Sequence, residues 1–343
     1  MSALRSFVAL IALLLSFLPA AARSITDAAG RVVEIPDKVE RVLAAGPPAS
    51  VLIYVLAPEK LAGWVREPKA EEKEFLLPAV RDLPTFGQLT GKGGTANIEA
   101  VLAAKPDIII DVGTVNPTYA SLADKIQAQT GIPYVLIDGA FAKSGATLRE
   151  TGAILGVEAR AETLAAYAEE TFATLEKGIA GIPEEKRPSV YYGRGAEGLE
   201  TGLAGSINME LIEAVGARNV AAAAGKGGLT QVSLEQVLSW KPDVILAVSP
   251  KFAKAVKTDA LWAGLDAVKS GRIQATPGLP FGWIDSPPGI NRLIGVAWLE
   301  HTLYPEAFPA ALDEEVRRFF KLFYQVDLSD DQLEALLGKA PAK

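Results

Sequence analysis

Aromatic and charged side chains that could hold a ligand follow several of the segments with strand character. Trp64, Arg66 and Gln88 lie in the first half of the chain, and the remaining candidates lie in the second half: Tyr192, Arg194, Trp283, Asp285 and Arg292. Flat aromatic faces bury organic surface, and guanidinium groups bind carboxylates through two parallel hydrogen bonds. These residues predict a site for a large, partly apolar, anionic complex, with Arg66 and Arg194 approaching from opposite lobes. The alternative is that Trp283 packs a core and Arg194 is a solvated loop residue.

Direct metal ligation and catalysis have few candidate residues. The sequence contains no cysteine and one histidine, His301, near the end of a predicted helix. Protein zinc sites need several histidine, cysteine or carboxylate ligands, so we expect any metal to arrive already chelated. Gly91-Lys92-Gly93 lacks the Ser or Thr of a phosphate-binding loop, and no Gly-x-Ser-x-Gly motif occurs. The sequence therefore predicts a binding protein without a cofactor, a protein-bound metal or enzymatic activity.

An internal duplication organises the chain. Residues 97–102 precede Lys105-Pro106-Asp107, and the related residues 233–238 precede Lys241-Pro242-Asp243. Each copy begins with a good N-cap residue and must end its helix before the proline. An apolar, largely β-branched run follows each Lys-Pro-Asp unit, over 108–112 and 244–248, which is typical of a buried parallel strand. The pattern predicts two similar α/β lobes.

Further segments complete the predicted architecture. Strands are expected over 39–45, 134–138 and 190–192, and apolar residues at helical spacing predict a long helix between the lobes. We predict an N-terminal lobe over 23–142, one connecting helix over 143–186, and a C-terminal lobe over 187–343. The fold class is α/β, with two central, mainly parallel sheets joined by one long helix.

The N-terminus predicts export. Arg5 precedes an apolar run over 7–18, and Ala20-Ala21-Ala22 supplies small residues for cleavage, so residues 1–22 are expected to be a signal peptide. The apolar run is too short to span a bilayer as a helix. Without cysteine no lipid can be attached to an N-terminal thiol, which favours a freely diffusing periplasmic protein. The net charge of −7 makes nucleic acid and anionic membranes poor partners, and we expect a monomer.

Several short motifs in order resemble the periplasmic substrate-binding proteins of metal-chelate ABC importers, which serve ferric siderophores, haem and cobalamin. The matching segments are 25–31, 39–42, the two Lys-Pro-Asp units with their helices, 155–162 and 216–220. The resemblance covers nearly the whole mature chain. It implies a ligand cleft between two lobes joined by a single long helix, and a permease dimer in the inner membrane as the partner.

The resemblance also implies that one glutamate on each lobe docks onto the permease, and these positions match Glu99 and Glu235. The alternative is that both carboxylates only complement the dipole of their helices. The sequence thus favours a binding protein for a ferric siderophore, with cobalamin, haem or a nickel or cobalt chelate as alternative ligands. A secreted two-lobed α/β enzyme and a receptor-coupled sensor are alternatives from other classes.

Overall fold

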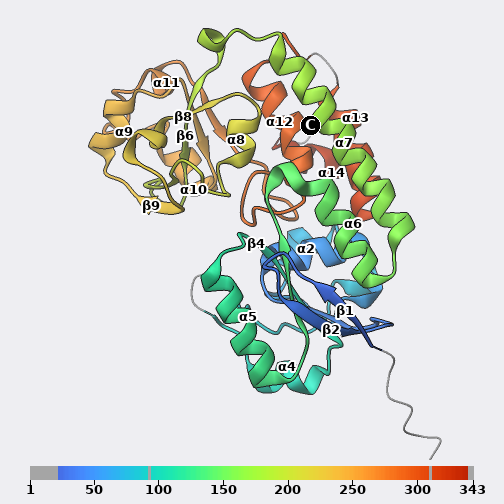
Figure 1. Ribbon diagram of the computed structural model, residues 1–343. Coiled ribbons are helices and arrows are strands. Elements are labelled where there is room, and N and C mark those ends of the chain that lie inside the picture. Colours follow the sequence, from blue (N-terminus) through green and yellow to red (C-terminus); the bar gives the residue numbers. More distant parts are fainter. Residues whose placement is uncertain (1–21, 92–93, 309–310, 339–343) are drawn as a thin grey trace, which may run out of the picture.

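Two separate parallel sheets form the centres of two α/β lobes (Figure 1). The computed structural model describes residues 22–91, 94–308 and 311–338. The N-terminal sheet has the order β3 (Val42–Ala44), β4 (Ile108–Gly113), β5 (Tyr134–Asp138). The C-terminal sheet has the order β11 (Ile273–Ala275), β10 (Val244–Ala247), β6 (Ser189–Gly193), β8 (Arg218–Asn219). All pairings within these sheets are parallel, which confirms the predicted fold class.

Two antiparallel ribbons and several helices complete the lobes. The ribbons pair β1 (Ala22–Thr26) with β2 (Val32–Pro36), and β7 (Glu200–Gly202) with β9 (Leu229–Gln231). The predicted signal peptide lies outside the described residues except for Ala22, which begins β1. The helices that cover the sheets are α2 (Pro47–Leu56), α5 (Pro117–Thr130), α8 (Glu210–Ala214), α10 (Pro250–Ala255) and α11 (Asp266–Lys269). The short helix α3 (Ala70–Lys73) belongs to the first lobe. None of the described helices is long and apolar enough to span a membrane.

The duplicated unit has the same local structure in both lobes. The helices α4 (Ile98–Ala104) and α9 (Leu234–Trp240) begin at Asn97 and Ser233, whose side chains accept hydrogen bonds from backbone N–H groups of the first turn. Both helices end at a lysine in the left-handed conformation, with φ 47° at Lys105 and at Lys241. The structure therefore confirms the repeated helix-then-strand unit.

The aspartate of each Lys-Pro-Asp unit ties the unit to its neighbouring strand. Asp107 accepts hydrogen bonds from the N–H groups of Glu40 and Arg41, at 2.7 and 2.8 Å. Asp243 accepts one from the N–H group of Ser189 at 2.7 Å and another from the hydroxyl of the same residue. Because each carboxylate holds the residues just before or at the start of the adjacent strand, it helps to set the register of β3 against β4 and of β6 against β10.

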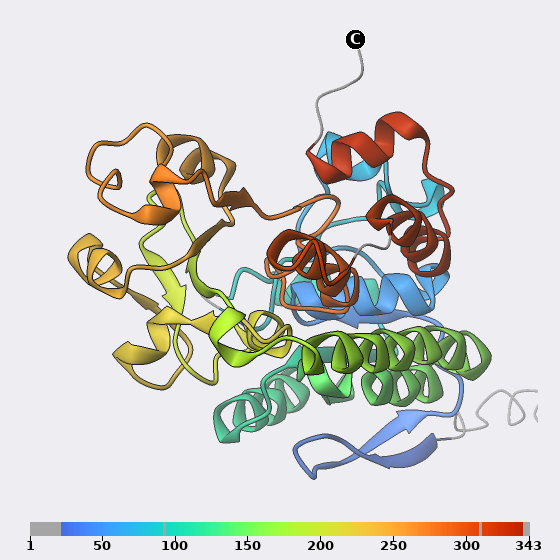
Figure 2. The same cartoon turned by 90° about the horizontal axis from the view of Figure 1, so that it is seen from above.

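Two helices, rather than one, occupy the segment predicted as a single connecting helix over 143–186. The helices α6 (Ser144–Leu155) and α7 (Glu158–Ala180) are separated at Gly156, which has φ 69°. They lie side by side along one edge of the molecule (Figure 2). A glycine tolerates the left-handed conformation that ends α6, so the chain turns back at this point.

Of these two helices, α7 is the one that connects the lobes. Near its start, Arg160 donates to the carbonyl of Val55 in the N-terminal lobe at 2.7 Å. Near its end, Ile179 lies against Gly216 in the C-terminal lobe, where an added Cβ would come within 3.1 Å of its side chain. The helix is buried along the face that carries Leu164, Ala168 and Leu175. A packed helix of 23 residues therefore fixes the separation of the lobes.

The C-terminal helices return to the N-terminal lobe. They are α12 (Arg292–Leu303), α13 (Leu312–Phe319) with the π-helical turn η6 (Phe320–Tyr324), and α14 (Asp330–Leu337). Tyr54 on α2 donates to the carbonyl of Tyr324 at 3.1 Å, and Phe75 lies edge-on to Phe320. The predicted C-terminal lobe over 187–343 is therefore divided, because its last segment completes the core of the first lobe.

Candidate ligand-binding cleft

A small cavity lies where the carboxyl ends of the N-terminal strands face the second lobe. We call it the cleft cavity; its volume is about 250 Å³. The first lobe contributes Gly46 after β3 and Val112 to Val115 around the end of β4. The second lobe contributes Ile207, Asn208 and Pro288. Ligands of open α/β sheets bind beyond the carboxyl ends of the strands, so this cavity is the expected position for a ligand.

Close backbone packing shapes one wall of the cleft cavity. Gly46 is the N-cap of α2, and a Cβ there would lie 2.9 Å from Thr90 Oγ1. Gly91 has φ 90°, a conformation that favours glycine. These two glycines bring the Thr90 hydroxyl and the start of α2 to the same edge of the cavity. The N-terminus of a helix carries a partial positive charge, which favours an anion at this position.

A buried carboxyl group, Asp111, forms the floor of the cavity. It accepts hydrogen bonds from Thr90 Oγ1 at 3.2 Å and from the Tyr134 hydroxyl at 3.0 Å. Burial raises the pKa of Asp111, although both hydrogen bonds favour its charged form.

A polar network links the cleft cavity to the second lobe. Asn208 lines the cavity and donates to Asp285 Oδ1 at 2.8 Å. The other oxygen of Asp285 pairs with Arg194 Nε at 2.8 Å, and Arg194 also pairs with Glu200 at 3.1 Å. Burial and the Asp285 carboxylate both raise the pKa of Tyr192. Three predicted site residues, Tyr192, Arg194 and Asp285, are therefore together, and Asp285 contacts Asn208 on the cavity lining.

A second cavity between the lobes, of about 600 Å³, has Arg66 on its wall. We call it the Arg66 cavity. Arg66 makes two hydrogen bonds to Glu72, at 2.6 and 2.9 Å, and its guanidinium carbon lies 5.8 Å from the centre of the Phe281 ring. Asp285 also lines this cavity. Arg66 of the first lobe lines this cavity, whereas Arg194 of the second lobe is linked to it only through Asp285, and each arginine is already paired with a carboxylate.

Arg292 binds the two lobes to each other. It is 2% exposed and donates to the Gly139 carbonyl of the first lobe at 2.6 Å. On the second lobe it donates to the Ile207 carbonyl at 3.1 Å and to Glu210 at 2.8 Å. Its guanidinium carbon also lies 5.1 Å from the centre of the Phe141 ring. With all these partners the side chain is placed as an inter-lobe clasp, which differs from the expected ligand contact.

The two predicted tryptophans lie in the hydrophobic core. Trp64 is 2% exposed and donates through Nε1 to the Val80 carbonyl, and Trp283 is fully buried and donates to the Leu279 carbonyl. Trp64 packs against Phe281, so the two segments belong to one core and do not form facing walls. Tyr192 is also fully buried, and Gln88 is half-buried in the loop before Thr90. Both tryptophans are therefore packing residues of the core.

The predicted docking residues, Glu99 and Glu235, are exposed. Each lies in the first turn of its helix, and α4 and α9 lie on the outer sides of their respective lobes (Figure 1). The adjacent backbone N–H and the Ser233 hydroxyl lower the pKa of Glu235. Both carboxylates are thus available to a partner at equivalent positions.

Sequence reasoning missed several residues that line the cleft cavity. Asp111, Gly113, Thr114 and Asn208 were not among the predicted site residues. The first three lie at the carboxyl end of a strand that the sequence did predict, so extending the strand-end rule to β4 would have identified them. Asn208 has no such signal, because its position depends on how the second lobe faces the first.

Comparisons with known proteins agree with this architecture. The family model described as periplasmic binding protein matches residues 58–278. The molybdate-binding protein MolA of Haemophilus influenzae is 29% identical, over 92% of this chain and 95% of its own. An ABC transporter solute-binding protein from Sulfurospirillum deleyianum has a TM-score of 0.83 at 30% identity, covering 92% of this chain and 99% of the other. The nickel-bound CeuE of Helicobacter pylori has a TM-score of 0.73 at 17% identity, covering 92% and 99%, which shows the fold alone.

These matches confirm the resemblance inferred from the order of the motifs. They associate the chain with substrate-binding components of ABC importers, and not with enzymes. The chain belongs to the periplasmic binding protein family.

Proposed function

We propose that this protein binds a small metal oxyanion, with molybdate as the first candidate, in the cleft cavity and delivers it to an ABC permease. The observation that carries the proposal is the cavity itself. Its volume is about 250 Å³. On its described lining, the ionisable side chains are Asp111 and the weakly acidic Tyr119. The relative named as a molybdate-binding protein supports the choice of oxyanion.

The lining suits a small anion held by neutral hydrogen-bond donors. Thr114 and Asn208 offer hydroxyl and amide groups, and Gly91 and Gly113 let a ligand approach the backbone closely. Oriented dipoles and a helix N-terminus stabilise an anion without a fully charged partner. The Thr90 and Tyr134 hydroxyls donate to Asp111, and these hydrogen bonds partly offset the repulsion that its carboxylate would exert on an anion.

Size separates this ligand class from the ferric siderophore that the sequence favoured. Drug-sized ligands occupy pockets of roughly 300–1,000 Å³, and the cleft cavity is smaller. The Arg66 cavity, at about 600 Å³, is large enough for an organic chelate, and Lys69 also lines it. A carboxylate-bearing metal chelate in the Arg66 cavity is therefore the second candidate, and the haem, cobalamin and nickel or cobalt chelates weighed from the sequence belong to it.

The proposal extends to location and partner. The apolar N-terminal segment supports export to the periplasm, where the ligand would be captured. The equivalent, exposed positions of Glu99 and Glu235 support docking of one lobe onto each half of a permease dimer. Exposed ion pairs contribute about 0–1 kcal/mol each, so these residues would orient the complex more than hold it.

Isothermal titration calorimetry of the purified protein tests the ligand class. The probes are molybdate, tungstate, sulfate and a ferric hydroxamate complex. We expect saturable binding of molybdate or tungstate and a loss of about 10- to 100-fold in affinity in Thr114→Val, since one hydrogen bond to a charged ligand is removed. Thr258→Val, on the exposed surface of the second lobe, is the matched control and should bind like the wild type.

Two results would count against the oxyanion. Binding of the ferric complex alone would transfer the site to the Arg66 cavity, and Arg66→Met should then weaken it. Equal oxyanion affinity in Thr114→Val and Thr258→Val would place the anion outside the cleft cavity.

A further inference from the structure

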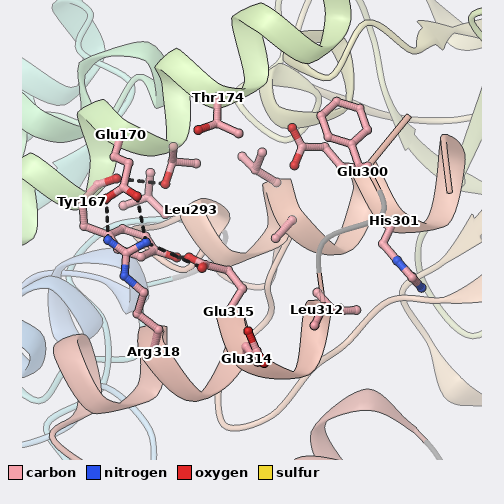
Figure 3. A pocket seen from close by; sticks show the side chains of 15 residues that line it. Tyr167, Glu170, Thr174, Leu293, Glu300, His301, Leu312, Glu314, Glu315 and Arg318 are labelled. Carbon is pink, nitrogen blue, oxygen red and sulfur yellow. Dashed lines mark hydrogen bonds and ion pairs between the residues drawn. The ribbon is translucent and has the colours of Figure 1, made fainter. Parts of the chain in front are cut away.

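A separate cavity lies on the side of the molecule formed by α7, α12 and α13, away from the strand ends. We call it the α12 cavity; its volume is about 290 Å³. Figure 3 shows its lining, with Arg318 and its partners at one end and Glu300 at the other. Leu293, Val296 and Phe308 contribute to an apolar wall. The function proposed above makes no use of this cavity.

One end of the α12 cavity is already neutralised. Arg318 pairs with Glu170 and lies 3.6 Å from Glu315, and its guanidinium carbon is 4.9 Å from the centre of the Tyr167 ring. The Tyr167 hydroxyl donates to Glu315 at 2.5 Å. The charges at this end therefore have partners within the protein.

Glu300 lies at the other end of the α12 cavity. It is 7% exposed, and its Oε1 has no hydrogen-bond partner in the described part of the chain. A buried carboxylate without a cation or donor is costly, so such groups are usually paired. Burial and the nearby Glu315 raise the pKa of Glu300 to about 7. The group can therefore ionise near neutral pH if a cation is supplied.

The charge of the lining favours a cation from outside. Four glutamates and one arginine line the cavity, which leaves a formal excess of three negative charges when Glu300 is ionised. The titratable and charged groups of these helices that line the cavity are Tyr167 and Glu170 on α7, Glu300 and His301 on α12, and Glu314, Glu315 and Arg318 on α13. No group of three or more such ligands among the described residues is placed to hold a metal ion. An apolar wall beside a carboxylate suits an organic cation better than a hydrated inorganic one.

We propose that the α12 cavity is a second ligand site, which binds a primary alkylammonium ion. The ammonium group pairs with the Glu300 carboxylate, and the alkyl chain lies against Leu293, Val296 and Phe308. The site is independent of the cleft cavity, so it does not depend on the oxyanion being the transported ligand.

Calorimetric titration of the full mature chain with n-butylammonium chloride at pH 8 tests this site. We expect saturable binding at millimolar concentration, no saturable binding of the neutral analogue n-butanol, and a loss of at least tenfold in Glu300→Gln. Glu314→Gln is the matched control, because it removes the same charge from an exposed position on the same cavity. It should weaken binding less than threefold.

A second readout separates a specific pair from a general electrostatic effect. When the cation fixes Glu300 in its ionised form, titration at pH 7 in buffers of different ionisation enthalpy should reveal proton release in the wild type and not in Glu300→Gln. Equal affinity in the two glutamine variants, equal binding of butanol, or no saturable binding would overturn the proposal. Oxyanion binding in the cleft should be unchanged in Glu300→Gln, so the two proposals can fail separately.

Discussion

Replacing Arg292 by methionine should remove the hydrogen bonds that join the two lobes and lower the unfolding free energy. The guanidinium donates to the carbonyls of Gly139, Ile207 and Gly289 and to the Glu210 carboxylate. Methionine keeps part of the apolar stem but removes every donor. Three carbonyl groups and one carboxylate would then lose a partner at the junction of the lobes.

The expected loss is about 4 kcal/mol of unfolding free energy. Removing one member of a buried ion pair costs about 3–5 kcal/mol, because the other charge is left without a partner. The Glu210 side chain is 32% exposed and can be rehydrated, which argues against a value above this range. Arg292→Lys should lose less, since one ammonium group can still reach a single acceptor.

Urea unfolding followed by circular dichroism measures the effect. Arg149→Met is the control, because Arg149 also pairs with two glutamates, Glu162 and Glu169, but lies on the surface. The control should unfold close to the wild-type midpoint. If Arg292→Met unfolds at the same urea concentration as Arg149→Met, the guanidinium is not an inter-lobe clasp and the argument from its contacts fails.

Two further predictions concern carboxylates. The pKa of Glu300 is raised from 4.5 to about 7 in the folded protein. Its favourable contribution to the unfolding free energy is therefore fully present below pH 4.5 and is lost as the pH rises through 7. Without a bound cation, the unfolding free energy of Glu300→Gln relative to the wild type should therefore rise by about 2 kcal/mol between pH 4.5 and pH 8, after allowance for solvent screening. Urea unfolding at the two pH values measures this difference, and an equal difference at both would refute the prediction. Reversing the charge at both Glu99 and Glu235 should abolish uptake in cells while leaving calorimetric ligand affinity unchanged; a loss of affinity would defeat the docking assignment.

Local patterns were sufficient to predict the repeated unit. Proline ends the helix before each Lys-Pro-Asp motif, and the β-branched runs that follow can be buried on both faces, so α4, β4, α9 and β10 were predictable. The role of Asp107 and Asp243 in holding the adjacent strand was not, because it depends on which strands become neighbours.

The ligand site was less predictable because the same residue types serve both packing and binding. Trp64 and Trp283 fill the core that joins the lobes, and Arg292 donates its hydrogen bonds to carbonyl groups of both lobes. Nothing in the local sequence distinguishes these uses. Small residues such as Gly113 and Thr114 line the cleft cavity instead, and they carry no compositional signal of their own.

The return of the C-terminal helices to the first lobe has a consequence for folding. The Tyr54 hydroxyl donates to the Tyr324 carbonyl, and the Phe75 ring packs against Phe320. The first lobe therefore cannot complete its core until residues near the C-terminus have been added. Contacts between such distant positions form slowly, because a long loop must close before they yield any stabilisation. During synthesis the first lobe therefore keeps an uncovered apolar surface, and a chain shortened before residue 320 would lose the native state of both lobes together.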